Sequence, residues 1–293
     1  MPDHVPVLLS AVLTELHLTA NDKVIDATLG GGGHAAAILD AIGPGGRLLG
    51  IEADPRTLRG TTEVLAANGS RVITVQGNFR TIERLANDHG FHQVAAVLFD
   101  LGVSSMTLAD ARRGFSWQAD GPLDMRFDPD HQSLTAADIV NHWLPSELAH
   151  LLRTLGEEHM AGPITQLLVN RRMDQPWRTT GELAEAIAQV KHRRGRRHPA
   201  TQTFQALRMA VNDELGALRE ALPPALALLR PGGRLAVISF HSLEDRLVKQ
   251  WSKDQARQGR LTLVNKHVIV PARPEQITNP RSRSAKLRVM QKI

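Results

Sequence analysis

The most informative absence from this 293-residue sequence is cysteine, of which it has none. Without cysteine there is no disulfide framework, no thiolate nucleophile and no cysteine-ligated zinc, which excludes zinc fingers and the zinc-dependent base deaminases. The sequence also lacks a GxxxxGK[ST] phosphate loop and a GxSxG nucleophile elbow. Tyrosine is absent and aromatic residues make up only 4% of the chain. Few side chains are therefore available to stack on nucleic-acid bases.

Long apolar runs are missing as well. No stretch of about eighteen apolar residues could span a bilayer, and the N-terminus lacks the basic flank of a secretory signal and the arginine-rich pattern of a transit peptide. We therefore expect a cytoplasmic protein with no membrane partner, and we expect no metal site. The apolar content of 42% is sufficient for a large buried core.

Positive charge is in excess, with a net charge of +5 and a pI near 10. This balance favours a polyanionic partner, because lysine and arginine displace the counterions that condense on phosphates. Arginine outnumbers lysine and suits phosphate oxygens and base edges better. Arginine also occurs in three clusters, and each cluster taken alone is as compatible with a solvated surface loop as with an RNA contact. The clusters are Arg171-Arg172, the segment from Lys191 to His198, and Arg281-Ser-Arg-Ser-Ala-Lys286.

The first hundred residues alternate between strand-like and helix-like patterns. This alternation predicts an α/β fold with a parallel sheet and right-handed crossovers. Short apolar runs bounded by turn residues predict strands at Lys23–Ala27, Arg47–Glu52, Arg71–Val75 and Val94–Asp100. Helical spacing of apolar residues predicts helices at Val7–Leu18, His34–Ile42, Pro55–Asn68 and Thr81–His89.

The alternation stops after Gly102, and the next hundred residues are polar, turn-rich and then helical. The expected helices there are Ala136–Trp143, Ser146–Leu155, Pro163–Arg172 and Thr180–Val190. The α/β pattern resumes with a helix over Thr203–Leu222, a strand over Arg234–Phe240, a helix over Leu243–Gln258 and strand-like stretches at Leu261–Val270 and Lys286–Gln291. We therefore expect a core formed by residues 1–105 and 201–293, interrupted by an inserted helical domain over residues 106–200.

Four successive glycines, Gly30–Gly33, lie between the first strand and its helix. Such a turn lets the backbone approach a ligand, and the helix start adds unpaired N–H groups. Glu52 ends the next strand, where a carboxylate can accept hydrogen bonds from ribose hydroxyls. The pattern predicts a nucleoside cofactor but does not separate a nicotinamide dinucleotide from S-adenosylmethionine.

Two further strand ends carry polar side chains at the edge where open α/β sheets bind ligands. Asp100 could receive the adenine amino group of a cofactor or hold a reacting amine, although an aspartate in this place is also a common turn residue. His241 and Arg246 follow the last core strand and are candidate contacts for a base and a phosphate. Ordinary capping by Ser242 and Asp245 is an equally good interpretation.

A few aromatic residues are candidates for stacking on a base. Phe115 and Trp117 lie in a polar stretch and are candidate platforms for an unstacked base, with Phe127 and Phe240 as further possibilities. Each of these four is individually more typical of a buried core residue.

Several blocks along the whole chain resemble the signature motifs of the bacterial 16S rRNA cytosine-N4 methyltransferases, a class I family. The blocks are His4-Val-Pro-Val-Leu-Leu9, Asp26-Ala-Thr-Leu-Gly-Gly-Gly-Gly-His34, Asp100-Leu-Gly-Val-Ser-Ser105, Arg113-Gly-Phe-Ser-Trp117, Asp120-Gly-Pro-Leu-Asp-Met-Arg126, His198-Pro-Ala-Thr-Gln-Thr-Phe-Gln-Ala-Leu-Arg208, Ser239-Phe-His-Ser-Leu-Glu-Asp-Arg246 and Asn279-Pro-Arg-Ser-Arg-Ser-Ala-Lys-Leu-Arg288.

The resemblance implies a class I methyltransferase sheet, Rossmann-like, with an inserted helical domain that helps to bind the substrate. It implies S-adenosyl-L-methionine as cofactor and S-adenosyl-L-homocysteine as product. The cofactor contacts that it implies are Gly32, Gly33, His34, Glu52, Phe79 and Asp100. The family usually has aspartate in place of Glu52 and Pro-Gln in place of Met106-Thr107, so Thr107 inherits the glutamine contact only weakly.

The expected activity is methylation of N4 of a decoding-region cytosine in 16S rRNA of the small ribosomal subunit. Asp100 is the candidate catalytic residue. The candidate substrate contacts are Phe115, Trp117, Arg126, His241, Arg246 and Arg283. Two alternatives are an NAD(P)-dependent oxidoreductase, which the glycine turn allows, and a non-catalytic RNA-binding factor for ribosome assembly.

Overall fold

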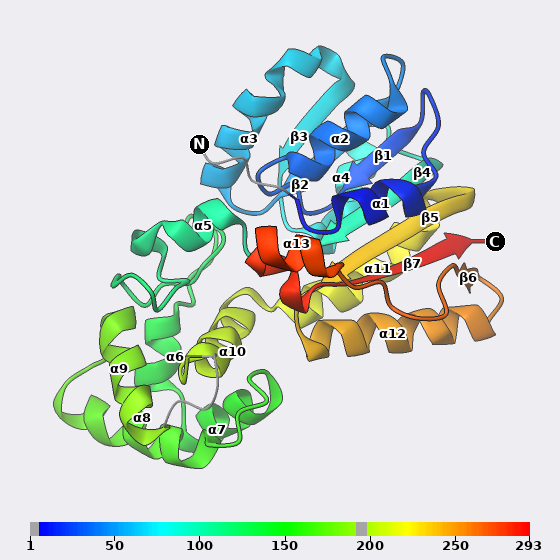
Figure 1. Ribbon diagram of the computed structural model, residues 1–293. Helices are drawn as coiled ribbons and strands as arrows, with labels where there is room; N and C mark the ends of the chain where they lie inside the picture. Colours follow the sequence, from blue (N-terminus) through cyan, green and yellow to red (C-terminus); the bar gives the residue numbers. More distant parts are fainter. Residues whose placement is uncertain (1–5, 192–197) are drawn as a thin grey trace. The chain divides into compact units, whose positions relative to one another are not determined.

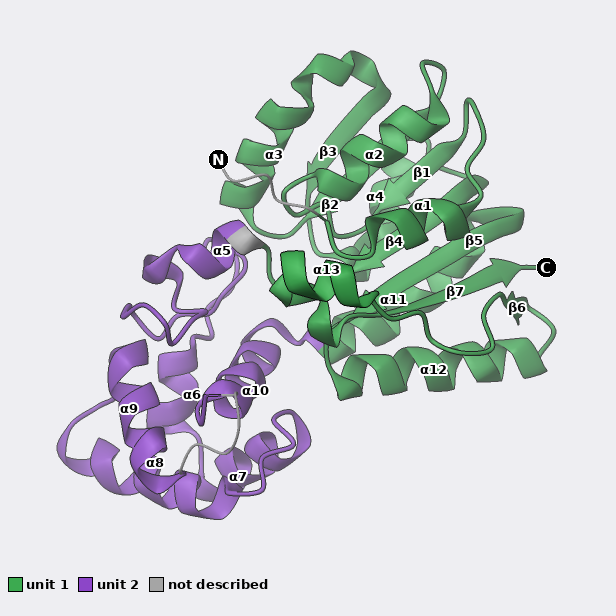
Figure 2. Cartoon of the chain, viewed as in Figure 1, with its two compact units in different colours: residues 1–104, 215–293 green, residues 105–214 purple. Residues whose placement is uncertain are grey.

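The computed structural model describes residues 6–191 and 198–293, which form two compact units. Unit 1 is Met1–Ser104 together with Leu215–Ile293, and unit 2 is Ser105–Glu214 (Figure 2). The interruption of an α/β core by a helical segment thus follows the sequence pattern. Unit 2 extends to Glu214, however, so the helix at Thr201–Asn212 lies within it and not in the second part of the core.

Unit 1 is built on one sheet of seven strands in the order β3-β2-β1-β4-β5-β7-β6 (Figure 1). The pairs from β3 to β5 are parallel, whereas β7 pairs antiparallel with both β5 and β6. The expected Rossmann-like α/β sheet is therefore confirmed, with an antiparallel edge. The strands are β1 (Lys23–Asp26), β2 (Arg47–Glu52), β3 (Val72–Gln76), β4 (Val94–Asp100), β5 (Leu229–Ser239), β6 (Leu261–Leu263) and β7 (Lys286–Lys292).

Helices cover both faces of this sheet, which explains why its central strands read as continuous apolar runs. Val24 and Leu98 belong to a buried cluster with residues of α1 and α2. Ile25 and Val97 belong to a second buried cluster with residues of α4, α11 and α12. The helices of unit 1 are α1 (Leu9–Leu16), α2 (Gly33–Ile42), α3 (Pro55–Leu65), α4 (Ile82–Asp88), α11 (Glu214–Leu228), α12 (Ser242–Arg257) and α13 (Arg273–Thr278), with short 3-10 helices η1 (Ala66–Arg71), η2 (Phe79–Thr81) and η4 (Pro280–Ser284).

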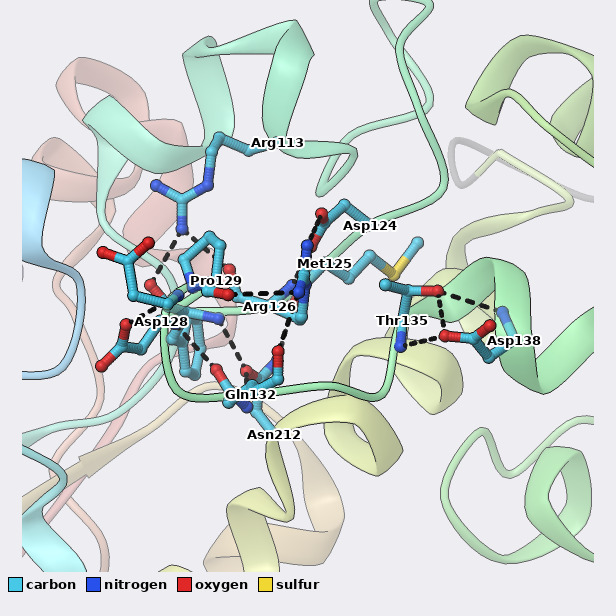
Figure 3. A network of polar contacts seen from close by, with 12 residues as sticks. Arg113, Asp124, Met125, Arg126, Asp128, Pro129, Gln132, Thr135, Asp138 and Asn212 are labelled. Carbon is cyan, nitrogen blue, oxygen red and sulfur yellow. Dashed lines mark hydrogen bonds and ion pairs between the residues drawn. The ribbon is translucent and has the colours of Figure 1, made fainter.

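Unit 2 is helical apart from an irregular stretch between η3 and α6. Its core contains Val140, Leu148 and Trp177, all at most 1% exposed. Arg113 donates to the carbonyl oxygens of Arg126 and Phe127 and so ties this irregular stretch together (Figure 3). The helices are α5 (Ser105–Ala109), η3 (Ala111–Arg113), α6 (Ala136–His142), α7 (Pro145–Thr154), α8 (Ala161–Asp174), α9 (Thr180–Val190) and α10 (Thr201–Asn212).

Three expected elements are wrong in extent. The strand expected over Arg234–Phe240 is longer, because β5 begins at Leu229 and ends at Ser239. The single helix expected over Thr203–Leu222 is two helices, α10 and α11, because Asp213 adopts a left-handed conformation with φ of 46°. The strand expected over Leu261–Val270 ends at Leu263, and only Ile269 returns to pair with Leu287 through an isolated bridge. Across residues 6–191 and 198–293, no helix has the length and apolar character needed to cross a membrane.

Candidate active site

The glycine turn forms the link between β1 and α2. Gly30 and Gly32 have φ of +50° and +79°, which side chains rarely adopt. A Cβ on Gly32 would lie 2.8 Å from Cγ2 of Thr61, and one on Gly33 would overlap the Pro6 ring. No side chain caps α2, whose N-cap is Gly32. The turn is bare of side chains at the positive end of a helix, with Gly31 exposed and Gly32 buried. Backbone N–H groups there fit the polar groups of a nucleoside cofactor.

Glu52 holds this turn from the end of β2. Its Oε2 accepts a hydrogen bond from the N–H of Gly30 at 2.9 Å, and its Oε1 accepts one from Asp54 at the same distance. Burial raises the pKa of Glu52 to about 7, although these two hydrogen bonds act in the opposite direction. Each carboxylate oxygen has a second lone pair. Glu52 can therefore shape the turn and still accept a hydrogen bond from a ribose hydroxyl.

Asp100 ends β4 with a side chain that is 26% exposed. Its Oδ2 lies 3.5 Å from Nδ1 of His34, whose Nε2 lies 3.0 Å from the carbonyl oxygen of Val7. Burial raises the pKa of Asp100 to about 8, and the charges of Asp26 and Glu244 add to the rise. Two predicted residues, His34 and Asp100, are thus in contact at the carboxyl edge of the sheet.

Asp26, at the end of β1, is a residue of this edge to which the sequence analysis assigned no role. It is 1% exposed, and its Oδ1 accepts a hydrogen bond from the N–H of Thr28 at 3.2 Å. Its pKa is raised to about 7, mainly by burial and further by the charge of Glu52. Its place at the end of the strand before the glycine turn could have identified Asp26 from the sequence, because the ends of parallel strands meet at one edge.

Phe79 follows β3 and begins η2. Its ring is partly buried and meets the Phe99 ring edge-on, with 5.6 Å between the centroids. The other predicted cofactor residue, Thr107, belongs to α5 of unit 2 and is 4% exposed. The contact expected between Thr107 and the cofactor stays a prediction.

The cap of α12 differs from the expected one by one residue. His241 is the N-cap, and Glu244 closes a capping box by accepting from the N–H groups of Phe240 and His241 at 2.9 and 3.3 Å. The expected pair of Ser242 and Asp245 is wrong, because His241 already has the extended conformation of a cap residue and the helix starts at Ser242.

Asp245 is not part of the cap and forms ion pairs with two basic residues of β7. Its carboxylate lies 3.1 Å from Nζ of Lys286 and 2.7 Å from Nε of Arg288. Arg246, the next residue, is exposed. Arg283 is exposed as well, and its Nε donates to the carbonyl oxygen of Gln276. Arg246 and Arg283 are thus accessible from solvent, as a phosphate contact requires.

Two predicted substrate residues of unit 2 have extensive internal contacts. Arg126 makes a two-pronged ion pair with Asp124 at 2.7 and 2.8 Å and donates to the carbonyl oxygens of Pro129 and Gln132 (Figure 3). Phe115 is 7% exposed and stacks on Phe127 at 5.4 Å. A base contact by either residue would require these interactions to rearrange.

Trp117 is only half-buried, but one ring face is covered by the imidazole of His198 at 4.0 Å. Of the arginine clusters, the pair Arg171-Arg172 has contacts within unit 2. Arg171 lies over the Trp177 ring at 4.0 Å, and Arg172 donates to the carbonyl oxygens of Val140 and Trp143. Most of the cluster from Lys191 to His198 lies outside the described residues. The pair Arg171-Arg172 therefore stabilises unit 2 itself.

The comparison of folds agrees with this architecture. The whole chain resembles the crystal structure of a protein from Clostridium thermocellum described as a candidate rRNA-methylase, with a TM-score of 0.50, 15% identity and coverage of 99% of this chain and 100% of that one. With this strand order and helices on both faces of the sheet, the chain has the fold of the class I methyltransferases.

The chain belongs to the MraW methylase family, whose sequence model matches residues 1–293. It is 49% identical to the ribosomal RNA small subunit methyltransferase H of Thermomicrobium roseum, over 99% of this chain and 94% of that protein. The protein of the same name from Heliobacterium modesticaldum is 45% identical, over 99% of this chain and 98% of the relative. The family resemblance of the motif blocks is thus confirmed.

Proposed function

We propose that this protein transfers a methyl group from S-adenosyl-L-methionine to N4 of a cytosine in the decoding region of 16S rRNA, acting on the small ribosomal subunit in the cytoplasm. The observation that carries the proposal is the bare glycine turn between Glu52 and Asp100, in a chain of a methylase family. The relatives named small subunit rRNA methyltransferases support an rRNA substrate. A methylase family also argues against the nicotinamide-dependent alternative.

The residues at the carboxyl edge of unit 1 fit the cofactor. Gly32 and Gly33 let the turn pack closely against Thr61 and Pro6, and the neighbouring Gly31 is exposed where a ligand could approach. Glu52 would accept hydrogen bonds from the ribose, and Phe79 would offer an apolar surface to the adenine. The bound cofactor supplies a methyl group on a positively charged sulfur. The residues of the chain then have to align this group with the acceptor nitrogen.

The acceptor nitrogen needs help because the lone pair of a cytosine amino group is delocalised into the ring. A hydrogen-bond acceptor aimed at its N–H bonds favours the pyramidal form that attacks. We assign this role to Asp100 and the loop that follows it to Ser105. The Asp100 carboxyl at the end of β4 can accept such a hydrogen bond through a lone pair on either of its oxygens.

The target base has to leave its stack before its amino group can enter such a site. Of the two candidate stacking residues Phe115 and Trp117, Trp117 is more accessible to a base, because Phe115 is buried. His241 lies at the end of β5, beside the acidic edge of the sheet. Arg246 and Arg283 are exposed cations suited to phosphates. Arg126 stays a predicted substrate contact of unit 2.

The test is to express the chain in a bacterial strain that lacks its own N4-cytosine rRNA methyltransferase. The 16S rRNA is then digested and analysed for N4-methylcytidine by mass spectrometry. We expect the modified nucleoside to appear with the wild-type chain. We expect the Asp100→Ala variant to react at least about 10²-fold more slowly with isolated small subunits.

The matched control is Asp254→Ala, which removes a side chain that is 58% exposed on α12. It should retain full activity. Unchanged turnover by Asp100→Ala would remove Asp100 from the mechanism. Binding of the chain to small subunits without any methylation would contradict the proposal and favour the non-catalytic assembly factor.

A further inference from the structure

The carboxyl edge of unit 1 brings several carboxyl groups together. Asp26, Glu52 and Asp100 end three adjacent strands, and Glu244 of α12 acts on Asp100 through its charge. Among the described residues, no ion pair joins Asp26, Glu52 or Asp100 to a lysine or an arginine. Buried carboxylates this close together cannot all be ionised at low cost. Some of them must retain a proton in the ligand-free protein.

Hydrogen bonding indicates which carboxyls these are. Both oxygens of Glu52 accept backbone N–H groups, and Glu244 accepts two from the start of α12. By contrast, Oδ2 of Asp26 and Oδ1 of Asp100 are buried and have no hydrogen-bond partner among the described residues. Hydrogen bonds from N–H groups stabilise a carboxylate, and an oxygen that lacks one favours the protonated acid. Asp26 accepts one such bond, from Thr28, and Asp100 contacts His34. Each has one oxygen without a partner, so their anions are the least stabilised of this edge.

We propose that Asp26 and Asp100 form a charge filter, protonated in the free protein and ionised when a cationic ligand binds, which selects the cationic methyl donor over the product. The inference rests on the proposed function, because the donor is a sulfonium and the product is a thioether. An ionised pair attracts the extra positive charge of the donor and gains nothing from the product. The filter thus favours release of the product after each transfer.

His34 acts in this filter as a positioning residue. The carbonyl oxygen of Val7 only accepts hydrogen bonds, so Nε2 of His34 carries a proton. The positive end of α2 disfavours a cationic imidazole. Nδ1 therefore presents a lone pair to Oδ2 of Asp100 at 3.5 Å and stabilises a proton there. The titratable groups around Asp100 are His34 from α2, Asp26 from β1 and Glu244 from α12.

The experiment measures the dissociation constants of S-adenosylmethionine and S-adenosylhomocysteine for the full chain from pH 6 to pH 9. Both ligands carry the same amino acid group, so its titration cancels in the ratio of the two constants. We expect the preference for S-adenosylmethionine to grow at least about tenfold over this range, because each carboxyl that ionises adds a negative charge that attracts the sulfonium and not the thioether. Calorimetry at pH 7 in buffers of different ionisation enthalpy should show proton release with S-adenosylmethionine and less with S-adenosylhomocysteine.

Three variants and one control locate the effect. Asp26→Asn and Asp100→Asn should flatten the pH dependence of the ratio, whereas Asp254→Asn on the exposed face of α12 should leave it unchanged. His34→Gln retains a donor for Val7 but removes the lone pair that faces Asp100. It should move the rise in the ratio to lower pH while keeping its size. Thermal unfolding of each variant shows whether it is folded, and the wild-type profile is decisive by itself.

A wild-type ratio that does not change with pH would overturn the filter while leaving the proposed function intact. The same holds if the ratio keeps its slope in both asparagine variants. If neither ligand binds at any pH, the proposed function fails and the filter fails with it. The two hypotheses are therefore distinguished by the same titrations.

Discussion

Gly33 illustrates how one residue without a side chain can determine the shape of the site. A methyl group at this position would overlap the Pro6 ring, whereas one at the exposed Gly31 would meet nothing within 4 Å. We expect Gly33→Ala to lower the free energy of unfolding by about 1–3 kcal/mol, because Pro6 has to move. It should also weaken binding of S-adenosylhomocysteine.

Gly31→Ala is the matched control and should stay within about 0.5 kcal/mol of the wild type. Urea denaturation and calorimetric titration measure the two quantities. Equal stability of the two alanine variants would show that the Pro6 segment yields without cost, contrary to the packing argument.

Single residues also mark where sequence reasoning reaches its limit. The positions of Gly32, Glu52 and Asp100 could be predicted because they depend on local order, a glycine turn or a strand end. The contact between His34 and Asp100 could not, because it joins α2 to β4 through the fold. Arg126 was interpreted as a substrate contact, but the neighbours that engage its guanidinium become visible only in the folded loop. Composition does not reveal which charges are already paired.

At the scale of elements, the last turn of α8 carries an arginine that forms hydrogen bonds with the end of α6. Nη1 of Arg172 donates to the carbonyl oxygens of Val140 and Trp143, at 3.0 and 2.9 Å, where α6 ends. Arg172→Ala should therefore destabilise the protein by about 1.5–3 kcal/mol, the contribution of hydrogen bonds from a charged donor. The exposed Arg178 provides the control, since Arg178→Ala should have almost no effect on thermal unfolding.

The opposite pattern would restore the nucleic-acid interpretation of the Arg171-Arg172 cluster. It would consist of an Arg172→Ala variant with wild-type stability and weakened binding to small subunits. Salt titrations of that binding would report how many phosphate contacts are lost.

Most elements could be predicted from periodicity, and the exceptions have specific causes. The apolar pattern continues from α10 into α11, so the break at Asp213 leaves no trace in the spacing. The short helix α13 was not predicted because it has no buried side chains and hence no apolar period. Periodicity reports which face is buried, and it says little about turns that bury nothing.

At the scale of the whole molecule, the acidic edge makes stability depend on pH. The pKa values of Asp26, Glu52 and Asp100 rise from 3.8, 4.5 and 3.8 to about 7, 7 and 8 on folding. Between these limits the folded chain holds protons that the unfolded chain has released. Stability is therefore lost as the pH rises through this window.

We expect the ligand-free protein to have a higher melting temperature at pH 6 than at pH 8. Asp100→Asn should reduce the difference, because it removes the group with the highest raised pKa of the three. Differential scanning calorimetry at the two pH values measures both effects. A wild-type protein that melts at a higher temperature at pH 8 than at pH 6 would contradict the raised pKa values of Asp26, Glu52 and Asp100.

The place of β7 has a consequence for biosynthesis. This strand, Lys286–Lys292, lies between β5 and β6. The N-terminal segment also depends on late residues, because the N–H of Leu8 donates a hydrogen bond to the carboxylate of Glu275. Until the ribosome has added these late residues, β5 presents an open edge that can pair with other chains. Residues 105–214 are complete well before that point, so the helical unit can fold first as an independent body. Nascent chains arrested shortly before Lys286 should thus carry a folded insertion within an unfinished sheet that needs protection from aggregation.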